Sequence, residues 1–175
     1  MVRARRRRIY WDSCVWLRYI NESPEDKRVL DWLLEQSSYR MGDIEIITSA
    51  ISLAEVAFAI VEQTKQALDE DVERQIDYLW ADHSAITIVE FYPQIAIEAR
   101  SLIRMGIPRG WSLTPLDAVH LATARRLQAT EFHTYDTRLF RYSDDVGFPV
   151  KEPYVPGGLP PEQTSFLTPD DGGAK

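Results

Sequence analysis

Four acidic residues each stand where a short apolar run gives way to the start of a helix or a turn. They are Asp12 in IYWDS (9–13), Glu55 in SLAEV (52–56), Asp117 in TPLDA (114–118) and Asp136 in FHTYD (132–136). A carboxylate among aliphatic and aromatic neighbours is costly to desolvate unless a cation meets it. If the fold brings the four together, the cation that suits them is a divalent metal with oxygen ligands. The pattern therefore indicates metal-dependent phosphodiester chemistry.

Apolar runs and helical periodicity alternate along the chain. Short runs rich in isoleucine and valine predict strands near residues 9–12, 44–48, 85–89 and 130–135, and a short edge strand near 148–151. Amphipathic spacing predicts helices over 24–34, 52–66, 69–80, 93–105 and 115–127. Proline at the first helical position marks three of these starts, at Pro24, Pro93 and Pro115, and Ser23 is a candidate N-cap.

Strands that alternate with helices predict an α/β fold with three layers, α/β/α, around a central, mainly parallel sheet. Ligands of such sheets bind beyond the carboxyl ends of the strands. Asp12 and Asp136 end predicted strands, and Glu55 and Asp117 fall in the first turn of predicted helices. These positions can share one edge of the sheet, and the metal hypothesis depends on that geometry.

Length and composition fit one domain with flanking segments. The chain has 175 residues, of which 45% are hydrophobic, enough for a real core. We expect a basic N-terminal arm over 1–8, the α/β domain over 9–152, and a flexible, acidic Pro/Gly-rich tail over 153–175. The net charge of −7 at first sight argues against a nucleic-acid partner, but it ignores bound metal and the distribution of charge.

The sequence shows no sign of a membrane segment or a disulfide framework. No run approaches the roughly 20 apolar residues of a membrane helix, and no apolar signal region follows the N-terminal arginines. The single Cys14 fits a reducing compartment, and we expect it to be a buried small hydrophobic residue. These features predict a soluble cytoplasmic protein with no membrane partner.

Each acid also has an innocent explanation. Ser52 with Glu55, and Thr114 with Asp117, both fit the capping-box pattern. Asp12 can begin a turn, and Asp136 can cap a short helix. Caps need not meet in space, however, whereas these four acids can.

The acids and their neighbours, taken in order, resemble a known family. The matching stretches are residues 9–17, 48–56, 116–124 and 132–140. This set resembles the PIN-domain nucleases, particularly the VapC-type toxins of toxin–antitoxin pairs, over roughly residues 8 to 150. The resemblance implies an endoribonuclease that depends on Mg²⁺ or Mn²⁺, acts on RNA, forms a homodimer and is inhibited by a small antitoxin protein.

The resemblance also implies roles for individual residues. By position, Asp12, Glu55, Asp117 and Asp136 match the acidic catalytic and metal-binding residues of that family. Ser13 and Thr134 match supporting hydroxyls beside the first and the last acid. Tyr135 departs from the pattern, because a small polar residue often precedes the last acid.

Other residues carry weaker hypotheses. Arg125, Arg126 and Arg138 are candidate RNA phosphate contacts, although solvated helix ends explain them as well. Trp111 is the tryptophan best placed to stack on a base. His120 lies one turn beyond Asp117 and is a candidate proton carrier, although an exposed or core histidine explains it better.

Rival functions use the same architecture. A catalytically inactive PIN-like module would bind RNA or protein and use its acids as helix caps. A phosphatase would need a second aspartate where Cys14 stands, and a signalling receiver domain would need an acidic pair beside Asp12. Both of the latter patterns are incomplete in this chain.

Overall fold

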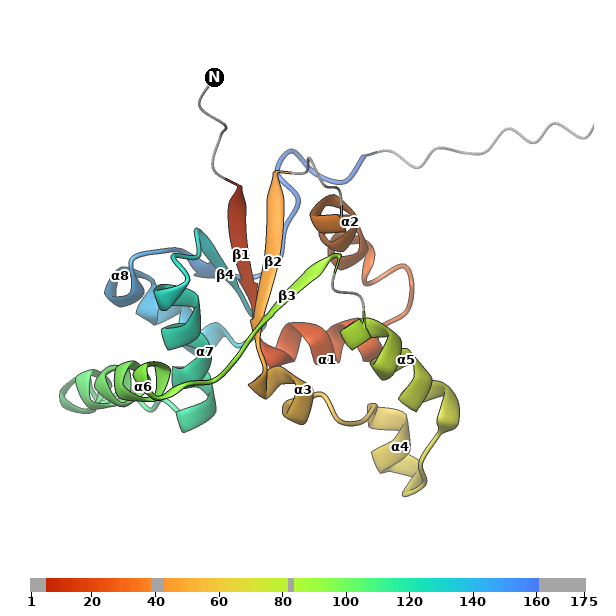
Figure 1. The fold of residues 1–175 in the computed structure, drawn as a ribbon, viewed down its shortest axis with the longest axis horizontal. Coiled ribbons are helices and arrows are strands. Elements are labelled where there is room, and N and C mark those ends of the chain that lie inside the picture. The colour runs from red at the N-terminus through yellow and green to blue at the C-terminus, as the bar shows by residue number, and fades with distance from the viewer. Residues whose placement is uncertain (1–5, 39–42, 82–83, 161–175) are drawn as a thin grey trace, which may run out of the picture.

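The computed structural model describes residues 6–38, 43–81 and 84–160, and its centre is a five-stranded sheet. The strand order is β3-β2-β1-β4-β5, and every neighbouring pair is parallel. The strands are β1 (Arg7–Trp11), β2 (Ile44–Ser49), β3 (Ile86–Val89), β4 (Glu131–His133) and β5 (Val150–Lys151). The predicted parallel α/β architecture is confirmed (Figure 1).

Helices cover both faces of the sheet, because successive side chains of a strand point to opposite faces. Ile9 and Trp11 pack on one face, with α1 (Ser13–Asn21), α2 (Arg28–Ser38) and α5 (Glu70–Ala81). Tyr10 packs on the other face, with α6 (Pro93–Gly106), α7 (Pro115–Arg126) and α8 (Ser143–Val146). The two groups of helices flank the sheet in Figure 1, which gives the three layers.

The start of the chain differs from the prediction. Strand β1 begins at Arg7, so Arg7 and Arg8 belong to the sheet and not to a free arm. Arg7 pairs with Glu131 at 2.5 Å, and Arg8 pairs with Glu45 at 3.0 Å. These ion pairs hold the two arginines against neighbouring strands. Residues 1–5 of the predicted arm lie outside the described residues.

Helix boundaries near the N-terminus also differ. Helix α1 starts directly after Asp12 and was not predicted. The helix predicted over 24–34 begins later, at Arg28, because Ser23 closes a turn instead. The Ser23 hydroxyl donates to the Asp26 carboxylate at 2.6 Å, and the Asp26 amide donates back to the Ser23 hydroxyl at 3.3 Å.

The helix predicted over 52–66 is broken in two. Helix α3 (Ile51–Glu55) ends early, and α4 (Ile60–Lys65) starts after an extended Ala59. The Ala59 amide donates to the Glu62 carboxylate at 3.0 Å, which fixes the new start. Glu55 therefore ends a short helix and does not begin a long one.

The C-terminal segment packs at first against the sheet. The Nζ atom of Lys151, in β5, lies 4.0 Å from the centre of the Tyr154 ring, and Val155 is buried. The first residues of the predicted tail thus contact the domain, and residues 161–175 lie outside the described residues. Among the helices that the structure describes, none has the length and apolar character to span a membrane.

Candidate active site

The strand order places the topological switch point of the sheet at the carboxyl ends of β1 and β4, where parallel sheets of this kind have their ligand crevice. Strands β2 and β3 lie on one side of β1, while β4 and β5 lie on the other. The chain therefore leaves these two central strands in opposite directions, which opens the usual ligand site of a parallel sheet. Asp12 follows β1 directly, and Thr134 and Asp136 follow β4. The Asp12 amide donates to the His133 carbonyl at 3.4 Å, which joins the two strand ends.

Asp12 is a buried carboxylate, with only 4% of the residue exposed. It caps α1, where its Oδ1 accepts from the Val15 amide at 3.3 Å and from the Cys14 thiol at 2.9 Å. Burial raises its pKa, and the opposing effects of His120 and of hydrogen bonds from Cys14 and Thr134 do not cancel this shift. Within the described residues, no lysine or arginine forms an ion pair with it.

Glu55 is held by a buried histidine. Its Oε2 lies 2.7 Å from Nε2 of His120, whose Nδ1 lies 2.8 Å from the Tyr10 hydroxyl. Because His120 is only 1% exposed, this chain of contacts runs from the core to the carboxylate. The predicted capping role of Glu55 is wrong: the Ser52 hydroxyl lies 2.8 Å from that of Thr48 instead.

Asp117 occupies the predicted first turn of α7. The Asp117 amide donates to the Thr114 hydroxyl at 3.2 Å, and that hydroxyl donates to the Asp117 carboxylate at 2.7 Å. Pro115 stands at the start of the helix as expected. The predicted helix cap is confirmed here, and it leaves the half-buried Asp117 carboxylate at the helix N-terminus, where negative charge is favoured.

Asp136 is paired with an arginine of its own turn. It caps the 3₁₀ helix η2 (Thr137–Tyr142) by accepting from the Arg138 amide at 2.9 Å. The Arg138 guanidinium also grips both carboxylate oxygens, with Nε 2.9 Å from Oδ1 and Nη2 2.5 Å from Oδ2. These hydrogen bonds hold the pKa of Asp136 below its usual range. The charge of Asp117 helps to raise the pKa of Arg138, after the larger effect of Asp136.

The structure places Asp12 and Asp136 just beyond the ends of neighbouring strands and gives two of the acids a direct partner: His120 contacts Glu55, and Arg138 pairs with Asp136. The charge of His120 also acts on Asp12, and that of Asp117 acts on Arg138, without a hydrogen bond between them. Figure 1 shows α1, α3 and α7 around the ends where the strands converge. Across residues 6–38, 43–81 and 84–160, no three carboxylate, imidazole or thiol groups lie close enough to hold a metal ion. Carboxylate oxygens are suitable ligands for a hard cation, but those of Glu55 and Asp136 are turned towards His120 and Arg138.

Thr134 and Cys14 join the first acid to the last. Thr134 is fully buried, and its hydroxyl accepts from the Asp136 amide at 2.9 Å. Its oxygen also lies 3.1 Å from the Cys14 sulfur, which accepts from the Tyr135 amide. Cys14 is therefore not the buried apolar residue that was predicted, and burial followed by the charge of Asp12 raises its pKa to about 12. The supporting role of Ser13, the first residue of α1, stays a prediction.

Two of the three predicted RNA contacts lie away from the acids. Arg125 and Arg126 end α7, whereas Asp117 is in its first turn. Arg125 pairs with Glu98 of α6 at 3.3 Å, and the Arg126 guanidinium donates to the Tyr92 hydroxyl at 3.2 Å. Only Arg138, among the three, touches a predicted site residue.

His120 is the residue whose role the sequence analysis missed. It lies three positions after Asp117, so both side chains come from one face of α7, about one turn apart. That spacing was the available signal. What it could not show was that Glu55, 65 residues earlier, is the partner of the imidazole.

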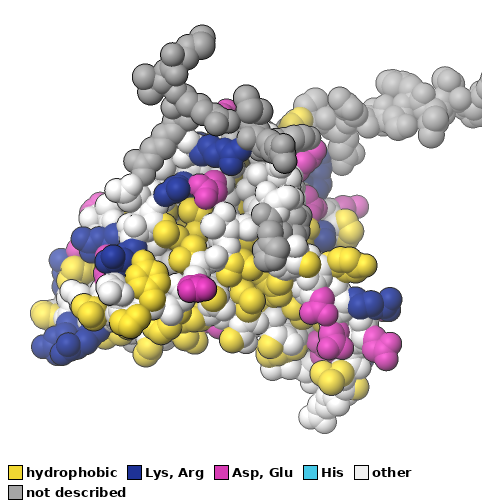
Figure 2. Space-filling model, viewed as in Figure 1, with side chains coloured by type: hydrophobic (Ala, Val, Ile, Leu, Met, Phe, Trp, Pro, Cys, Tyr) yellow, Lys and Arg dark blue, Asp and Glu magenta, His cyan; other side chains and the backbone are white. Residues whose placement is uncertain are grey.

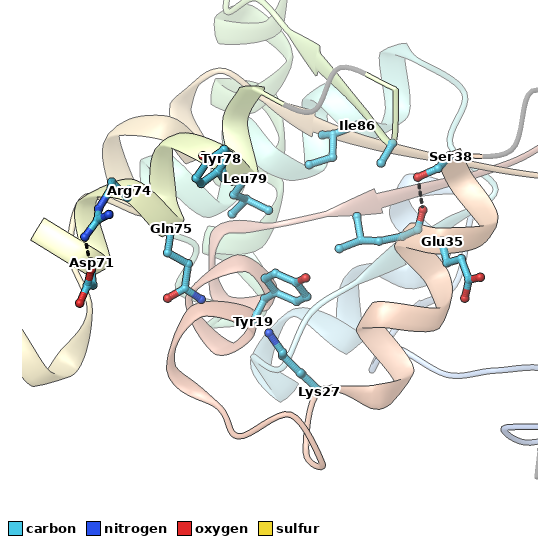
Figure 3. A pocket seen from close by; sticks show the side chains of 12 residues that line it. Tyr19, Lys27, Glu35, Ser38, Asp71, Arg74, Gln75, Tyr78, Leu79 and Ile86 are labelled. Atoms are coloured by element: carbon cyan, nitrogen blue, oxygen red, sulfur yellow. Dashed lines mark hydrogen bonds and ion pairs between the residues drawn. The ribbon is translucent and has the colours of Figure 1, made fainter. Parts of the chain in front are cut away.

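A separate cavity of about 610 Å³ lies between α2 and α5. Figure 3 shows Tyr19 and Lys27 at one wall, Glu35 at another and the ion pair of Asp71 with Arg74 across from them. None of the predicted site residues lines this cavity. The four acids therefore lie outside this cavity, near the strand ends.

Comparison with known proteins places the chain in a family. The family model described as PIN domain matches residues 9–145, a span that contains all four acids. The chain belongs to the PIN domain family. A comparison with curated proteins gave no match.

Solved structures support the same fold for this PIN domain. FitAcB from Neisseria gonorrhoeae is 25% identical, with a TM-score of 0.55, over 83% of this chain and 97% of that one. VapBC2 from Rickettsia felis, bound to a promoter DNA fragment, is 17% identical, with a TM-score of 0.61, over 82% and 98%. VapC20 from Mycobacterium tuberculosis, a sarcin–ricin loop cleaving toxin, is 13% identical, with a TM-score of 0.54, over 74% and 90%.

Proposed function

We propose that this PIN domain is a metal-dependent endoribonuclease that hydrolyses RNA phosphodiester bonds. The observation that carries the proposal is Asp12, a buried carboxylate with a raised pKa that meets no arginine or lysine among the described residues. It lies at the strand crevice with three further acids at the same edge. A carboxylate is retained in such a place at a cost in stability, which a bound cation would offset.

Asp12, Glu55, Asp117 and Asp136 would hold Mg²⁺ or Mn²⁺. Their oxygens are the ligands that these ions prefer, and few protein ligands leave room for water and phosphate. When bound, such an ion supplies positive charge that lowers the pKa of a water molecule and stabilises a leaving oxygen. Asp136 would have to leave Arg138 to take part, and that would free the guanidinium for a phosphate oxygen.

The remaining polar groups would position the acids. His120 holds Glu55 from inside the core, and its other nitrogen is fixed by Tyr10. The Thr134 hydroxyl lies between the Asp12 and Asp136 sides of the crevice. Because His120 and Thr134 are buried, their contacts limit the rotamers of the carboxylates that they touch.

The biological role that we propose is the toxin of a type II toxin–antitoxin pair. The similar VapC20 is described as a toxin that cleaves the sarcin–ricin loop, and the VapBC2 structure is a complex on promoter DNA. By this proposal the partners are an RNA substrate, a small antitoxin protein and a second copy of the chain. The cytoplasm is the compartment in which that RNA would be met.

The test is cleavage of labelled RNA by the purified protein. We expect cleavage with Mg²⁺ or Mn²⁺, none with EDTA, and a loss of at least a hundredfold in Asp12→Asn. Asp144→Asn, an exposed acid of α8, is the matched control and should keep full activity. Cleavage that persists in EDTA, or an Asp12→Asn protein as active as the parent, would refute the proposal.

A catalytically inactive PIN-like module that binds RNA or protein is the second candidate. The observation in its favour is that Glu55 and Asp136 already have partners in His120 and Arg138. Calorimetric titration with Mn²⁺ separates the two. The nuclease should bind Mn²⁺ in a fixed ratio that Asp12→Asn abolishes, whereas the inactive module should show no such site.

A further inference from the structure

A half-buried tryptophan lies among arginines beside the acids. Trp111 follows the 3₁₀ helix η1 (Ile107–Arg109), and its ring centre is 4.9 Å from the guanidinium carbon of Arg109. The guanidinium carbon of Arg141, in η2, lies 5.7 Å from the same centre. Tyr142 packs edge-on at 5.1 Å between ring centres. Two short helices far apart in sequence therefore hold the indole in place.

The backbone under Trp111 is also tightly packed. The Trp111 amide donates to the Gly106 carbonyl at 3.0 Å. A Cβ atom at Gly106 would lie 3.1 Å from the Tyr142 hydroxyl and 3.3 Å from the Trp111 Cβ. Such spacing leaves little room for a side chain at Gly106, so the position of the ring is set by close contact.

This group of residues borders the acidic crevice. Asp136 caps η2, the short helix that carries Arg138, Arg141 and Tyr142, and the Arg138 guanidinium pairs with the Asp136 carboxylate. Tyr142, at the other end of η2, packs against Trp111. Arg109, Trp111, Arg138 and Arg141 thus form one surface, here named the arginine–tryptophan surface, next to the last two acids.

The charges of this surface are only partly compensated. Arg109 pairs with Asp145 at 2.6 Å, and Arg138 pairs with Asp136. Within the part of the chain that the structure describes, no carboxylate forms an ion pair with the exposed Arg141. Arg141 is therefore the cation of this surface that is most available to a phosphate.

A polyanion needs such cations to approach this chain. The net charge is −7, and four carboxylates at one edge repel a phosphodiester. Acidic side chains gather elsewhere too: Figure 2 shows them at the lower right, over α5, whose first turn carries Glu70, Asp71 and Glu73. Guanidinium groups beside the crevice offer phosphate contacts where the acids do not.

Stacking energies favour an exchange on the tryptophan. A base stacked on an aromatic ring is held more strongly than an exposed arginine over the same ring. Arg109 and Arg141 are both exposed, so their guanidinium groups can leave the ring for phosphates, although Arg109 would have to give up its pair with Asp145. A ring face would then be open to a base. Stacking of this kind requires an unpaired base, which favours single-stranded over duplex RNA.

We infer that the arginine–tryptophan surface binds the single-stranded RNA segment beside the bond to be cut. Arg141 and Arg109 contact phosphates, and Trp111 stacks on a base. This inference rests on the proposed function and adds to it the path of the substrate, which runs from the crevice over η2 and η1.

The test measures RNA binding without cleavage. The full chain carrying Asp12→Asn, in EDTA, is titrated onto a fluorescent single-stranded oligoribonucleotide, and anisotropy is followed over a series of salt concentrations. Arg141→Ala should weaken binding severalfold and reduce the dependence on salt by about one phosphate contact. Trp111→Ala should weaken it by about five- to a hundredfold, and Trp111→Phe by less, because a smaller ring remains.

The chain offers a control arginine on the other face of the sheet. Arg74 of α5 is exposed and pairs with Asp71 of the same helix. Arg74→Ala removes the same charge far from the arginine–tryptophan surface, so it should bind RNA as the parent does. Thermal unfolding by circular dichroism checks that each variant is folded. Arg141→Ala remains decisive if Trp111→Ala is not folded.

Each outcome decides the inference. If the wild type cleaves RNA while Arg141→Ala and Trp111→Phe keep its RNA affinity and its KM, the inference about the arginine–tryptophan surface is refuted. The proposed nuclease function would then still stand. An equal loss in Arg74→Ala would reduce the effect to general charge and overturn the inference as well. Binding of an acidic peptide through the same residues, without RNA binding, would assign the surface to a protein partner. Absence of both Mg²⁺-dependent cleavage and RNA binding would overturn the proposed function together with the inference.

Discussion

Replacing Asp12 by asparagine should stabilise the metal-free protein. Asparagine keeps the Oδ1 acceptor for the Val15 amide and the Cys14 thiol, and it caps a helix as well as aspartate does. Those two hydrogen bonds should therefore change little, and the Thr134 hydroxyl, which also bonds to the Asp12 carboxylate, can accept from the new amide instead, while a desolvated charge is removed. We expect a gain of about 1–3 kcal/mol, typical of groups retained for function at a cost in stability. For a chain of this size the midpoint should rise by about 3–10 °C.

The gain should depend on pH in a definite direction. Burial raises the folded-state pKa of Asp12 above its usual value, so its protonated form is favoured in the native protein. That contribution to stability is complete below the unfolded pKa and is lost as the pH rises through the folded pKa. The wild type should therefore match Asp12→Asn at pH below about 4 and fall behind it towards neutrality.

Thermal unfolding by circular dichroism, with and without Mn²⁺, measures both effects. Saturating Mn²⁺ should stabilise the wild type, by about 2.7 kcal/mol at a hundredfold excess over Kd, and leave Asp12→Asn unchanged. The contrasting variant is Asp117→Asn, which loses a favourable charge at a helix N-terminus and should be less stable by about 0.3–1 kcal/mol. An Asp12→Asn protein less stable than the wild type at neutral pH, in EDTA, would refute the reasoning.

Three further outcomes are expected. Tyr10→Phe leaves Nδ1 of the buried His120 without its partner, so urea unfolding should show a loss of about 1–3 kcal/mol, and an unchanged midpoint would contradict this. Burial opposes ionisation of Glu131, but hydrogen bonds from its basic neighbours prevail and hold its pKa well below the usual range. Its stabilising effect should thus be complete at neutral pH, begin to fade below about pH 4 and be lost as the pH falls through the folded-state pKa. The stability of Glu131→Gln should therefore approach that of the wild type as the pH is lowered from about 4, and a constant difference would count against this reasoning. The raised pKa of Cys14 predicts slow reaction with a disulfide reagent at pH 8, and faster reaction in Asp12→Asn because one cause of the shift is removed; equal rates would argue against that coupling.

Short-range sequence patterns predicted much of the secondary structure. Isoleucine-rich runs marked β2 and β3 to within about a residue, because a buried strand needs a continuous apolar stretch. Proline at the first helical position marked the starts of α6 and α7 for an equally local reason. Local rules failed where another group competed: Ser23 made a turn with Asp26 and did not cap the helix that was predicted there.

The acids themselves were visible in the sequence, since a carboxylate at the end of an apolar strand is conspicuous without any structure. Their neighbours were not. Glu55 contacts the imidazole of His120, which lies 65 positions later in the chain. The capping box that the sequence suggested for Glu55 and Ser52 is absent, because the Ser52 hydroxyl contacts Thr48 instead. Conversely, Arg125 and Arg126 are only eight and nine positions after Asp117, yet they lie at the opposite end of α7.

The amino-acid sequence by itself determined the order of the five strands and of helices α2, α5, α6 and α7, the family to which the chain belongs, and which acidic residues stand near the junctions of strands, helices and turns. Only the tertiary structure decided which groups surround each acid. Glu55 contacts His120, and Asp136 pairs with Arg138. Asp12 is buried and has no arginine or lysine partner among the described residues. The reason is physical. Secondary structure follows from neighbours within a few residues, whereas the free energy of a carboxylate depends on the charges and water around it, and packing of distant segments sets both.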